Sequence, residues 1–308
     1  MASFRRNPIT GEPVILAPQR AQRPNAFGGG SEEVCPFCPG NESLTPPEIM
    51  RVGTADAWTI RVIPNKYPLA DARSGWDDDA PTPFGGRHEV VIESPDHDAA
   101  FESLSLDSAQ EIARVWIARY GALAAIDGCA SVAVFKNHGP LGGASLGHMH
   151  SQIVAMPFVP PRIAAEAAGF VRAGTCPLCD AIAGRHRNLI IEATAGFVRL
   201  APYASAMPFQ QWIVPKRHLP EINMLTDIET RDLAGHLRAA AADMTGVRRP
   251  ASYNWLLMSF PNLAAGHFYV DAFPRLTALA GFELGTGCGI NIVDPAEVAR
   301  GGIFKRSG

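Results

Sequence analysis

The sequence has no long apolar run and little net charge, and each absence excludes a class of protein. No stretch approaches the roughly 20 apolar residues that a membrane-spanning helix needs. The first residues, MASFRRNPITG, contain no apolar segment of the kind found in a secretory signal peptide. The formal net charge of −3 provides no general attraction to nucleic acid or to an anionic membrane. We therefore expect a cytoplasmic protein that binds neither nucleic acid nor membrane.

The composition is that of a folded protein with many turns. Hydrophobic residues make up 47% and charged residues 19% of the 308 residues, which allows a sizeable buried core. The chain has 29 Gly and 26 Pro, and this abundance favours short strands and turns over a long helical bundle. Six Cys in a cytoplasmic chain indicate metal ligands or buried thiols rather than a disulfide framework.

The sequence contains an internal repeat. Four Cys lie in two copies of one tetrapeptide, CPFC at 35–38 and CPLC at 176–179. Each copy is followed, in the same order, by an apolar stretch, a strand-like run ending in His, a helix, a β-rich run and a Gly-His pair. The two His landmarks are separated by 51 residues in the first copy (His97 to His148) and by 49 in the second (His218 to His267). This order predicts an α+β fold of two tandem units, 1–165 and 166–308, each an antiparallel sheet with one long helix.

Helices are expected over 105–126 and 225–244, where apolar residues recur at helical spacing. Asp107 with Gln110 is the predicted capping box of the first helix, and Thr226 with Glu229 is that of the second. A Pro cluster and small residues place the boundary between the units near 160–175.

Each CPxC copy predicts half of a metal site. A CxxC pair alone is either a redox pair or half of a zinc site, and the landmark His residues could be ordinary loop residues. Two Cys and two His form a ligand set that zinc prefers in a closed, structural site. We therefore predict two structural zinc ions, held by Cys35, Cys38, His97 and His148 and by Cys176, Cys179, His218 and His267.

The first copy alone carries residues suited to chemistry. The run HMHSQIV at 148–154 alternates like a strand, so His148, His150 and Gln152 point to one face. With His148 assigned to the metal, His150 is the predicted nucleophile, and Gln152 can donate its amide N–H to a phosphoryl oxygen. A coincidence of core residues is the alternative. In the second copy Tyr269 and Asp271 replace these two residues, which predicts a unit without the nucleophile.

A Gly-rich loop, FKNHGPLGGAS at 135–145, precedes this strand. Its backbone N–H groups and the Ser145 hydroxyl can cradle phosphates. Four His residues have no role in this reading and are expected in loops or at the surface: His88, His138, His186 and His236. The remaining thiols, Cys129 and Cys288, are expected to be buried.

The motifs CPFC, SPDH, FKNHGPLGGAS and HMHSQ, in this order and spacing, resemble the galactose-1-phosphate uridylyltransferase family of the HIT superfamily. The resemblance covers most of the chain and is strongest in its first half. The second Cys2His2 set and the segment GFELGTGC resemble the ADP-glucose phosphorylase branch of that family. Met149 and Ser151 stand where the family commonly has Pro and Gly, and neither lies on the predicted reactive face.

The resemblance implies a homodimeric transferase of galactose and carbohydrate metabolism that moves a nucleoside monophosphate. It implies that His150 attacks the α-phosphorus of a nucleotide sugar of the UDP-glucose type, that sugar 1-phosphate leaves, and that a hexose 1-phosphate takes the nucleotide from the histidine. It further implies contacts to nucleotide, phosphate or sugar from Arg20, Arg23, Asn65, Asn137, Gly143, Ala144, Ser145, Gln152, Phe282 and Glu283.

Three alternatives stay open from the sequence. The first is a phosphorylase, in which the donor is an ADP-sugar and the acceptor is inorganic phosphate. The second is a nucleotide hydrolase, in which the acceptor is water, but such enzymes carry a third His where Gln152 stands. A zinc-ribbon binding module would have no activity at all. The sequence leaves the base, the sugar and the acceptor undecided.

Overall fold

The computed structural model describes residues 2–22, 34–76, 85–247, 249–276 and 278–301. The chain forms two compact units and passes between them more than once. The first unit comprises Met1–Ala99, Val115–Phe135 and Ser145–Ala168; the second comprises Ala100–Arg114, Lys136–Ala144 and Gly169–Gly308. The predicted boundary between residues 165 and 166 lies within the helix α2 (Pro161–Ala173) and remains a prediction.

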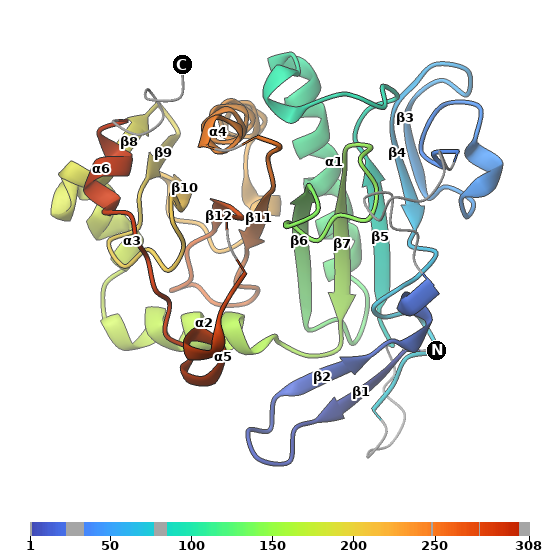
Figure 1. Ribbon diagram of the computed structural model, residues 1–308. Coiled ribbons are helices and arrows are strands. Elements are labelled where there is room, and N and C mark those ends of the chain that lie inside the picture. The colour runs from blue at the N-terminus through green and yellow to red at the C-terminus, as the bar shows by residue number, and fades with distance from the viewer. Residues whose placement is uncertain (1, 23–33, 77–84, 248, 277, 302–308) are drawn as a thin grey trace. The chain divides into compact units, whose positions relative to one another are not determined.

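The first unit is built on an antiparallel sheet in the order β3-β4-β5-β7-β6 (Figure 1). Its strands are β3 (Met50–Gly53), β4 (Trp58–Pro64), β5 (Arg87–Ile92), β6 (Ser131–His138) and β7 (His150–Met156). A separate hairpin of β1 (Ser3–Arg6) and β2 (Pro13–Leu16) precedes it, followed by the short helix η1 (Pro18–Gln22). The helix η2 (Glu42–Leu44) follows the first CPxC motif.

The two faces of this sheet have different surroundings. The second half of the helix α1 (Leu106–Ala124) covers one face: Trp116 donates to the Ser151 hydroxyl at 2.7 Å, and Arg119 makes a bidentate ion pair with Glu89. Because alternate residues of a strand point to opposite faces, His150 and Gln152 lie on the face away from α1. There they neighbour a cluster of buried apolar side chains, namely Phe37, Trp58, Ile63, Val90 and Ile92.

The second unit has the same plan. Its antiparallel sheet has the order β11-β12-β10-β9-β8. The strands are β8 (Ile190–Ala193), β9 (Phe197–Leu200), β10 (Gln211–Pro215), β11 (Tyr253–Met258) and β12 (Tyr269–Pro274). The long helix α4 (Asp227–Val247) packs on β9, β10 and β12. The predicted α+β architecture of two units, each an antiparallel sheet with a long helix, is confirmed.

Short helices complete the chain. They are η3 (Phe101–Ser103), α3 (Pro177–Asp180), η4 (Ala181–Arg185), η5 (Arg187–Leu189), η6 (Ile222–Met224), α5 (Gly281–Thr286) and α6 (Pro295–Ala299). Among the described residues, no helix combines the length and the apolar character needed to cross a bilayer.

The two predicted capping boxes have different outcomes. The second is confirmed: the Thr226 hydroxyl accepts from the Glu229 N–H at 3.3 Å, and the Glu229 carboxylate accepts from the Thr226 N–H at 2.8 Å. The first is wrong, because α1 begins at Leu106 and the Ser105 hydroxyl accepts from the Ser108 N–H at 3.0 Å. Asp107 therefore lies inside the first turn. The segment in which the boundary is predicted is mostly helical, since α2 occupies most of it.

Candidate active site and metal centres

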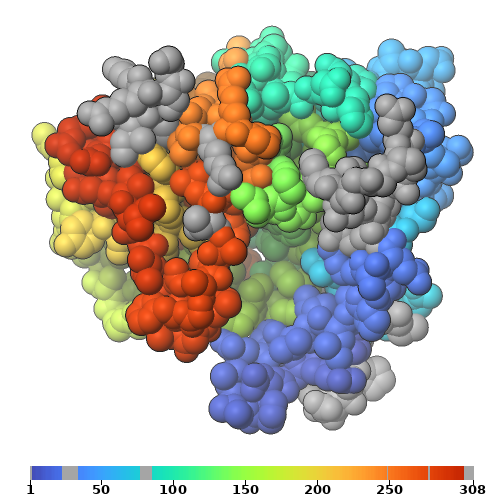
Figure 2. All heavy atoms as spheres, viewed as in Figure 1, coloured from blue at the N-terminus to red at the C-terminus, as the bar shows by residue number. Residues whose placement is uncertain are grey.

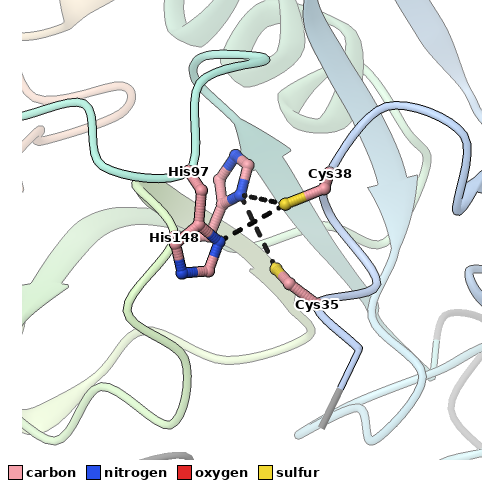
Figure 3. Close-up of side chains that lie close together, drawn as sticks. All are labelled: Cys35, Cys38, His97 and His148. Atoms are coloured by element: carbon pink, nitrogen blue, oxygen red, sulfur yellow. Dashed lines mark hydrogen bonds between the residues drawn. The ribbon is translucent and has the colours of Figure 1, made fainter. Parts of the chain in front are cut away.

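The first predicted metal set converges on one point of the first unit (Figure 3). Cys38 Sγ lies 3.3 Å from His97 Nδ1 and 3.6 Å from His148 Nδ1, and Cys35 Sγ lies 3.6 Å from the same His148 nitrogen. The His148 ring is fully buried and donates from Nε2 to the carbonyl of Ser94 at 2.8 Å. That bond leaves the lone pair on Nδ1, where a metal would bind.

The second predicted set converges in the same way in the second unit. Cys179 Sγ lies 3.4 Å from His218 Nδ1 and 3.5 Å from His267 Nδ1. Cys176 Sγ lies 3.3 Å from His267 Nδ1. Both rings donate from Nε2 to backbone carbonyls at 2.9 Å, so both keep Nδ1 for a metal. The donor pattern of the first unit is therefore repeated.

These distances test whether the residues fit a metal. A tetrahedral zinc ion with bonds of about 2.3 Å to sulfur and about 2.0–2.1 Å to nitrogen separates S from N by about 3.6 Å. The observed separations of 3.3–3.6 Å agree. All four ligand atoms of each set lie within 4.8 Å of one another. Both sets fit a closed, four-coordinate metal site.

One thiol of each set, Cys38 or Cys179, holds its proton more tightly than a free cysteine does. Burial, with the neighbouring Cys35, raises the pKa of Cys38 to about 11. Burial, with the neighbouring Cys176, raises the pKa of Cys179 to about 11. A metal that binds here must therefore displace protons.

His150 is the first residue of β7 and is buried, with 6% of its surface exposed. Its Nδ1 lies 2.8 Å from the carbonyl oxygen of His148. Because a carbonyl only accepts, the proton of the neutral ring is on Nδ1 and the lone pair is on Nε2. The ring of Phe37 packs edge-on against the imidazole at 5.5 Å between centroids. An imidazole fixed in this tautomer presents Nε2 as a nucleophile.

Gln152 lies two residues along the same strand and is joined to a residue that sequence reasoning missed. Its Oε1 is 3.0 Å from Nε2 of His88, a buried residue of β5. The predicted binding residue Asn65 is also at His88: its Nδ2 lies 3.2 Å from the same Nε2. Asn65 Oδ1 accepts from the Tyr67 N–H at 2.8 Å. The structure thus brings Asn65 and Gln152 together through His88.

Arg20 is hydrogen-bonded to the loop that contains Asn65 and Tyr67. Its Nη1 donates at 2.6 Å to the carbonyl oxygen of Tyr67, which lies two residues after Asn65 in the sequence. Ser145 belongs to the first unit and is half-buried, five residues before His150. Arg23 lies outside the described residues.

Residues 136–144 of the Gly-rich loop belong to the second unit, where Asn254 of β11 holds them. The Asn254 amide donates to Asn137 Oδ1 and to the Gly142 carbonyl, both at 2.8 Å. A Cβ at position 142 would collide with the backbone oxygens of His138 and Tyr253, so only Gly fits there. Gly143, at φ +79°, is exposed. Ala144 is buried. Asn254 had no recognisable motif in the sequence.

The predicted sugar-binding residues lie on α5, also in the second unit. Phe282 is exposed, with 56% of its surface accessible, and Figure 2 shows this red segment at the surface. Glu283 caps its own helix, because its carboxylate accepts from the Ala280 N–H at 3.2 Å.

The expectations for four of the remaining His and Cys residues are wrong. His88 and His236 are buried rather than at the surface. His236 lies within α4, and burial lowers its pKa. Cys288 is exposed, and Cys129 is only half-buried. A lone His or Cys in an apolar stretch carries no sequence signal for its burial, which depends on contacts distant in the chain.

Comparisons with known proteins agree with this geometry. Residues 71–160 match the model of the N-terminal domain of galactose-1-phosphate uridyl transferase. The ADP-glucose phosphorylase of Arabidopsis thaliana is 34% identical over 322 residues, covering 96% of this chain and 91% of that protein. The galactose-1-phosphate uridylyltransferase of Thermotoga maritima is 27% identical, covering 97% of each chain.

Solved structures lead to the same group. The crystal structure of the Arabidopsis thaliana ADP-glucose phosphorylase with bound ADP-glucose matches with a TM-score of 0.77, at 32% identity and 99% coverage of both chains. A uridylyltransferase structure matches with a TM-score of 0.82, at 26% identity, covering 100% of this chain and 98% of that one. The chain therefore belongs to the galactose-1-phosphate uridylyltransferase family, close to its ADP-glucose phosphorylase branch.

Proposed function

We propose that this protein is a nucleotidyltransferase that moves a nucleoside monophosphate from a nucleotide sugar to a phosphate-bearing acceptor through a nucleotidyl-His150 intermediate. The donor is of the UDP-glucose type and the acceptor is a hexose 1-phosphate. The observation that carries this proposal is the bond from His150 Nδ1 to the His148 carbonyl, which leaves the nucleophilic lone pair on Nε2.

The reaction has two displacements at one phosphorus atom. In the first, His150 Nε2 forms a bond to the α-phosphorus while the bond from that phosphorus to the bridging oxygen breaks, and sugar 1-phosphate leaves with the electron pair. In the second, a phosphate oxygen of the acceptor attacks the same phosphorus and the P–N bond breaks, which returns His150 to its starting state. Dividing one displacement into two lowers the barrier of each.

The protein supplies position and charge stabilisation. Gln152 donates an amide N–H to a non-bridging oxygen of the α-phosphoryl group, where negative charge is concentrated. Ser145, Asn65 and Arg20 bind phosphate or nucleotide from the first unit. Asn137, Gly143 and Ala144, with Phe282 and Glu283 for the sugar, complete the proposed binding set. Arg23 is also a member of this proposed binding set.

A second candidate is an ADP-sugar phosphorylase that uses inorganic phosphate as the acceptor. The observation that favours it is the greater similarity to ADP-glucose phosphorylase, 34% against 27% identity for the Thermotoga maritima uridylyltransferase. The two candidates share the first displacement and differ in the base of the donor and in the second acceptor.

Both Cys2His2 sets hold zinc in this proposal. Four protein ligands leave no open position, so the metal holds the CPxC loops to the sheets and takes no part in the bond-breaking steps. The proposal includes a homodimer, as the family resemblance implies, and a cytoplasmic location, as the sequence analysis expects.

Intact-protein mass spectrometry tests the proposal. The purified protein is mixed with UDP-glucose, UDP-galactose or ADP-glucose and then weighed. The mass added to the chain identifies the transferred nucleoside monophosphate, and chasing the adduct with a hexose 1-phosphate or with inorganic phosphate identifies the acceptor.

The His150→Gly variant is the control for this experiment. It should form no adduct while keeping its zinc and its circular dichroism spectrum, because only the nucleophile has been removed. An acid-labile adduct that persists in this variant would show that another residue is the nucleophile.

A further inference from the structure

We propose that His88 is a positioning residue that fixes which end of the Gln152 amide faces the substrate. This role deepens the proposed function and rests on it, since Gln152 is there the phosphoryl contact. His88 lies on β5 with 4% of its surface exposed, on the same sheet face as His150 and Gln152.

The tautomer of His88 follows from its neighbours. The Leu69 backbone N–H lies 2.9 Å from Nδ1, and because an N–H only donates, Nδ1 must be the acceptor. The proton of the neutral ring is then on Nε2, 3.0 Å from Gln152 Oε1. The other tautomer would set N–H against N–H at Leu69 and two lone pairs against each other at Gln152. It would gain only the contact with the Asn65 amide.

The orientation of Gln152 follows from that tautomer. Its amide oxygen is bound to the His88 N–H, so its NH2 group, with two donors, is turned to another partner. An amide in the reverse orientation would present its oxygen to a phosphoryl oxygen, and the two would repel. Without the His88 donor, nothing in the chemistry of the amide favours the productive orientation, because the amide torsion is roughly two-fold.

In the first unit, a loop N–H binds one side chain, which in turn binds a residue of the next strand; we call this arrangement a relay. The second unit contains the same relay built from different residues. Gln210 Oε1 accepts from the Ala206 N–H at 2.8 Å, and Gln210 Nε2 donates to Asp271 Oδ1 at 2.6 Å. In the register of the two sheets, Val90 pairs with Gln152 as Trp212 pairs with Asp271. His88 and Gln210 each precede these partners by two residues, so they occupy equivalent positions.

The comparison separates scaffold from function. Both units use a loop N–H, a side chain on β5 or directly before β10, and a residue on β7 or β12. The receiving residue differs: Gln152 keeps two N–H donors on its far end, whereas the Asp271 carboxylate has none. The relay can therefore orient a phosphate donor only in the first unit.

A double-mutant cycle tests the proposal by measuring the single-turnover rate of nucleotidyl-His150 formation. His88→Leu should slow this step by about 10- to 100-fold, the usual effect of removing a partner that orients a functional ligand. His88→Gln should restore most of the rate, because Gln performs both contacts at position 210. In the Gln152→Ala background, His88→Leu should cause no further loss beyond about twofold.

Gln210→Leu is the matched control, since it removes the same relay from the unit without the nucleophile. It should lower thermal stability as much as His88→Leu does while leaving the rate of adduct formation unchanged. Two results would overturn the proposal: a wild-type rate in His88→Leu, or an equal slowing by His88→Leu with and without Gln152. Failure of the wild-type protein to form any adduct would instead refute the proposed function.

Discussion

Removing one zinc ligand from each unit should cause similar losses of stability but different losses of activity. The matched pair is Cys38→Ser and Cys179→Ser. Each sulfur faces both His ligands of its set, at 3.3 and 3.6 Å in the first unit and 3.4 and 3.5 Å in the second. Each variant should therefore lose close to one of the two zinc ions.

The stability loss can be worked from the length of chain that each metal closes. Cys38 and His148 are 110 residues apart in sequence, and Cys179 and His267 are 88 apart. A cross-link that closes a loop of about 100 residues stabilises by about 4.7 kcal/mol in the chain-entropy model. Each variant should then lose roughly 4 kcal/mol, which lowers the melting temperature by roughly 10 °C.

The loss of activity should depend on whether the removed ligand belongs to the set that contains His148. The His148 carbonyl accepts the Nδ1 proton of His150, so the residue that fixes the nucleophile is also a metal ligand. Cys38→Ser should slow adduct formation by about 10- to 100-fold at a temperature where the protein stays folded. Cys179→Ser should change it by no more than about twofold, because Tyr269 stands where a nucleophile would be.

Three measurements check this prediction: zinc content by elemental mass spectrometry, melting by calorimetry, and the single-turnover rate of adduct formation. Equal rate losses in the two variants would refute the reasoning, since activity would then follow overall stability rather than the His148 contact. Unchanged zinc in Cys38→Ser would remove Cys38 from the ligand set.

Two further predictions concern the second unit. Arg217 lowers the pKa of Glu229 to about 2 from 4.5, so this carboxylate contributes stability that is present above pH 4.5 and is lost as the pH falls through about 2. Glu229→Gln should therefore cost about 1 kcal/mol at neutral pH, after allowance for the half-exposed Arg217, and urea titrations in which this difference does not shrink on acidification would contradict the assignment. Asn254→Ala removes two hydrogen bonds from the Gly-rich loop and should raise the KM for the nucleotide sugar about tenfold, with the zinc content unchanged. An unchanged KM would show that this loop does not hold the donor.

The sequence predicted the metal sets and the nucleophile because their signals are local or repeated. The CPxC motif and its two landmark His residues occur once in each copy of the repeat at matching intervals, and the structure brings each set together. The alternation of HMHSQIV placed His150 and Gln152 on one face without knowledge of any partner strand.

His88 and Asn254 were missed because their roles depend on pairing between distant segments. His88 is 64 residues from Gln152, and Asn254 is 117 residues from Asn137. One signal was available: a polar residue, His88 or Gln210, lies at or next to the start of the strand that precedes the first landmark His of each copy. The division of α1 between the two units had no such signal, since it depends on tertiary contacts.

The two units show which features are sufficient for folding and which are needed for chemistry. Both keep the Cys2His2 set, the sheet order, the long helix and the relay onto β7 or β12, so these features stabilise the fold whether or not a reaction occurs. The two units differ in chemistry at two positions, residues 150 and 152 of β7 in the first unit and residues 269 and 271 of β12 in the second. A phenol is a poorer nucleophile than a neutral imidazole near neutral pH, because its pKa is about 10. A carboxylate at position 271 would repel a diphosphate and offers no donor to it. The second unit therefore keeps a Cys2His2 set and its fold, yet it lacks counterparts of the two groups that the proposed transfer uses.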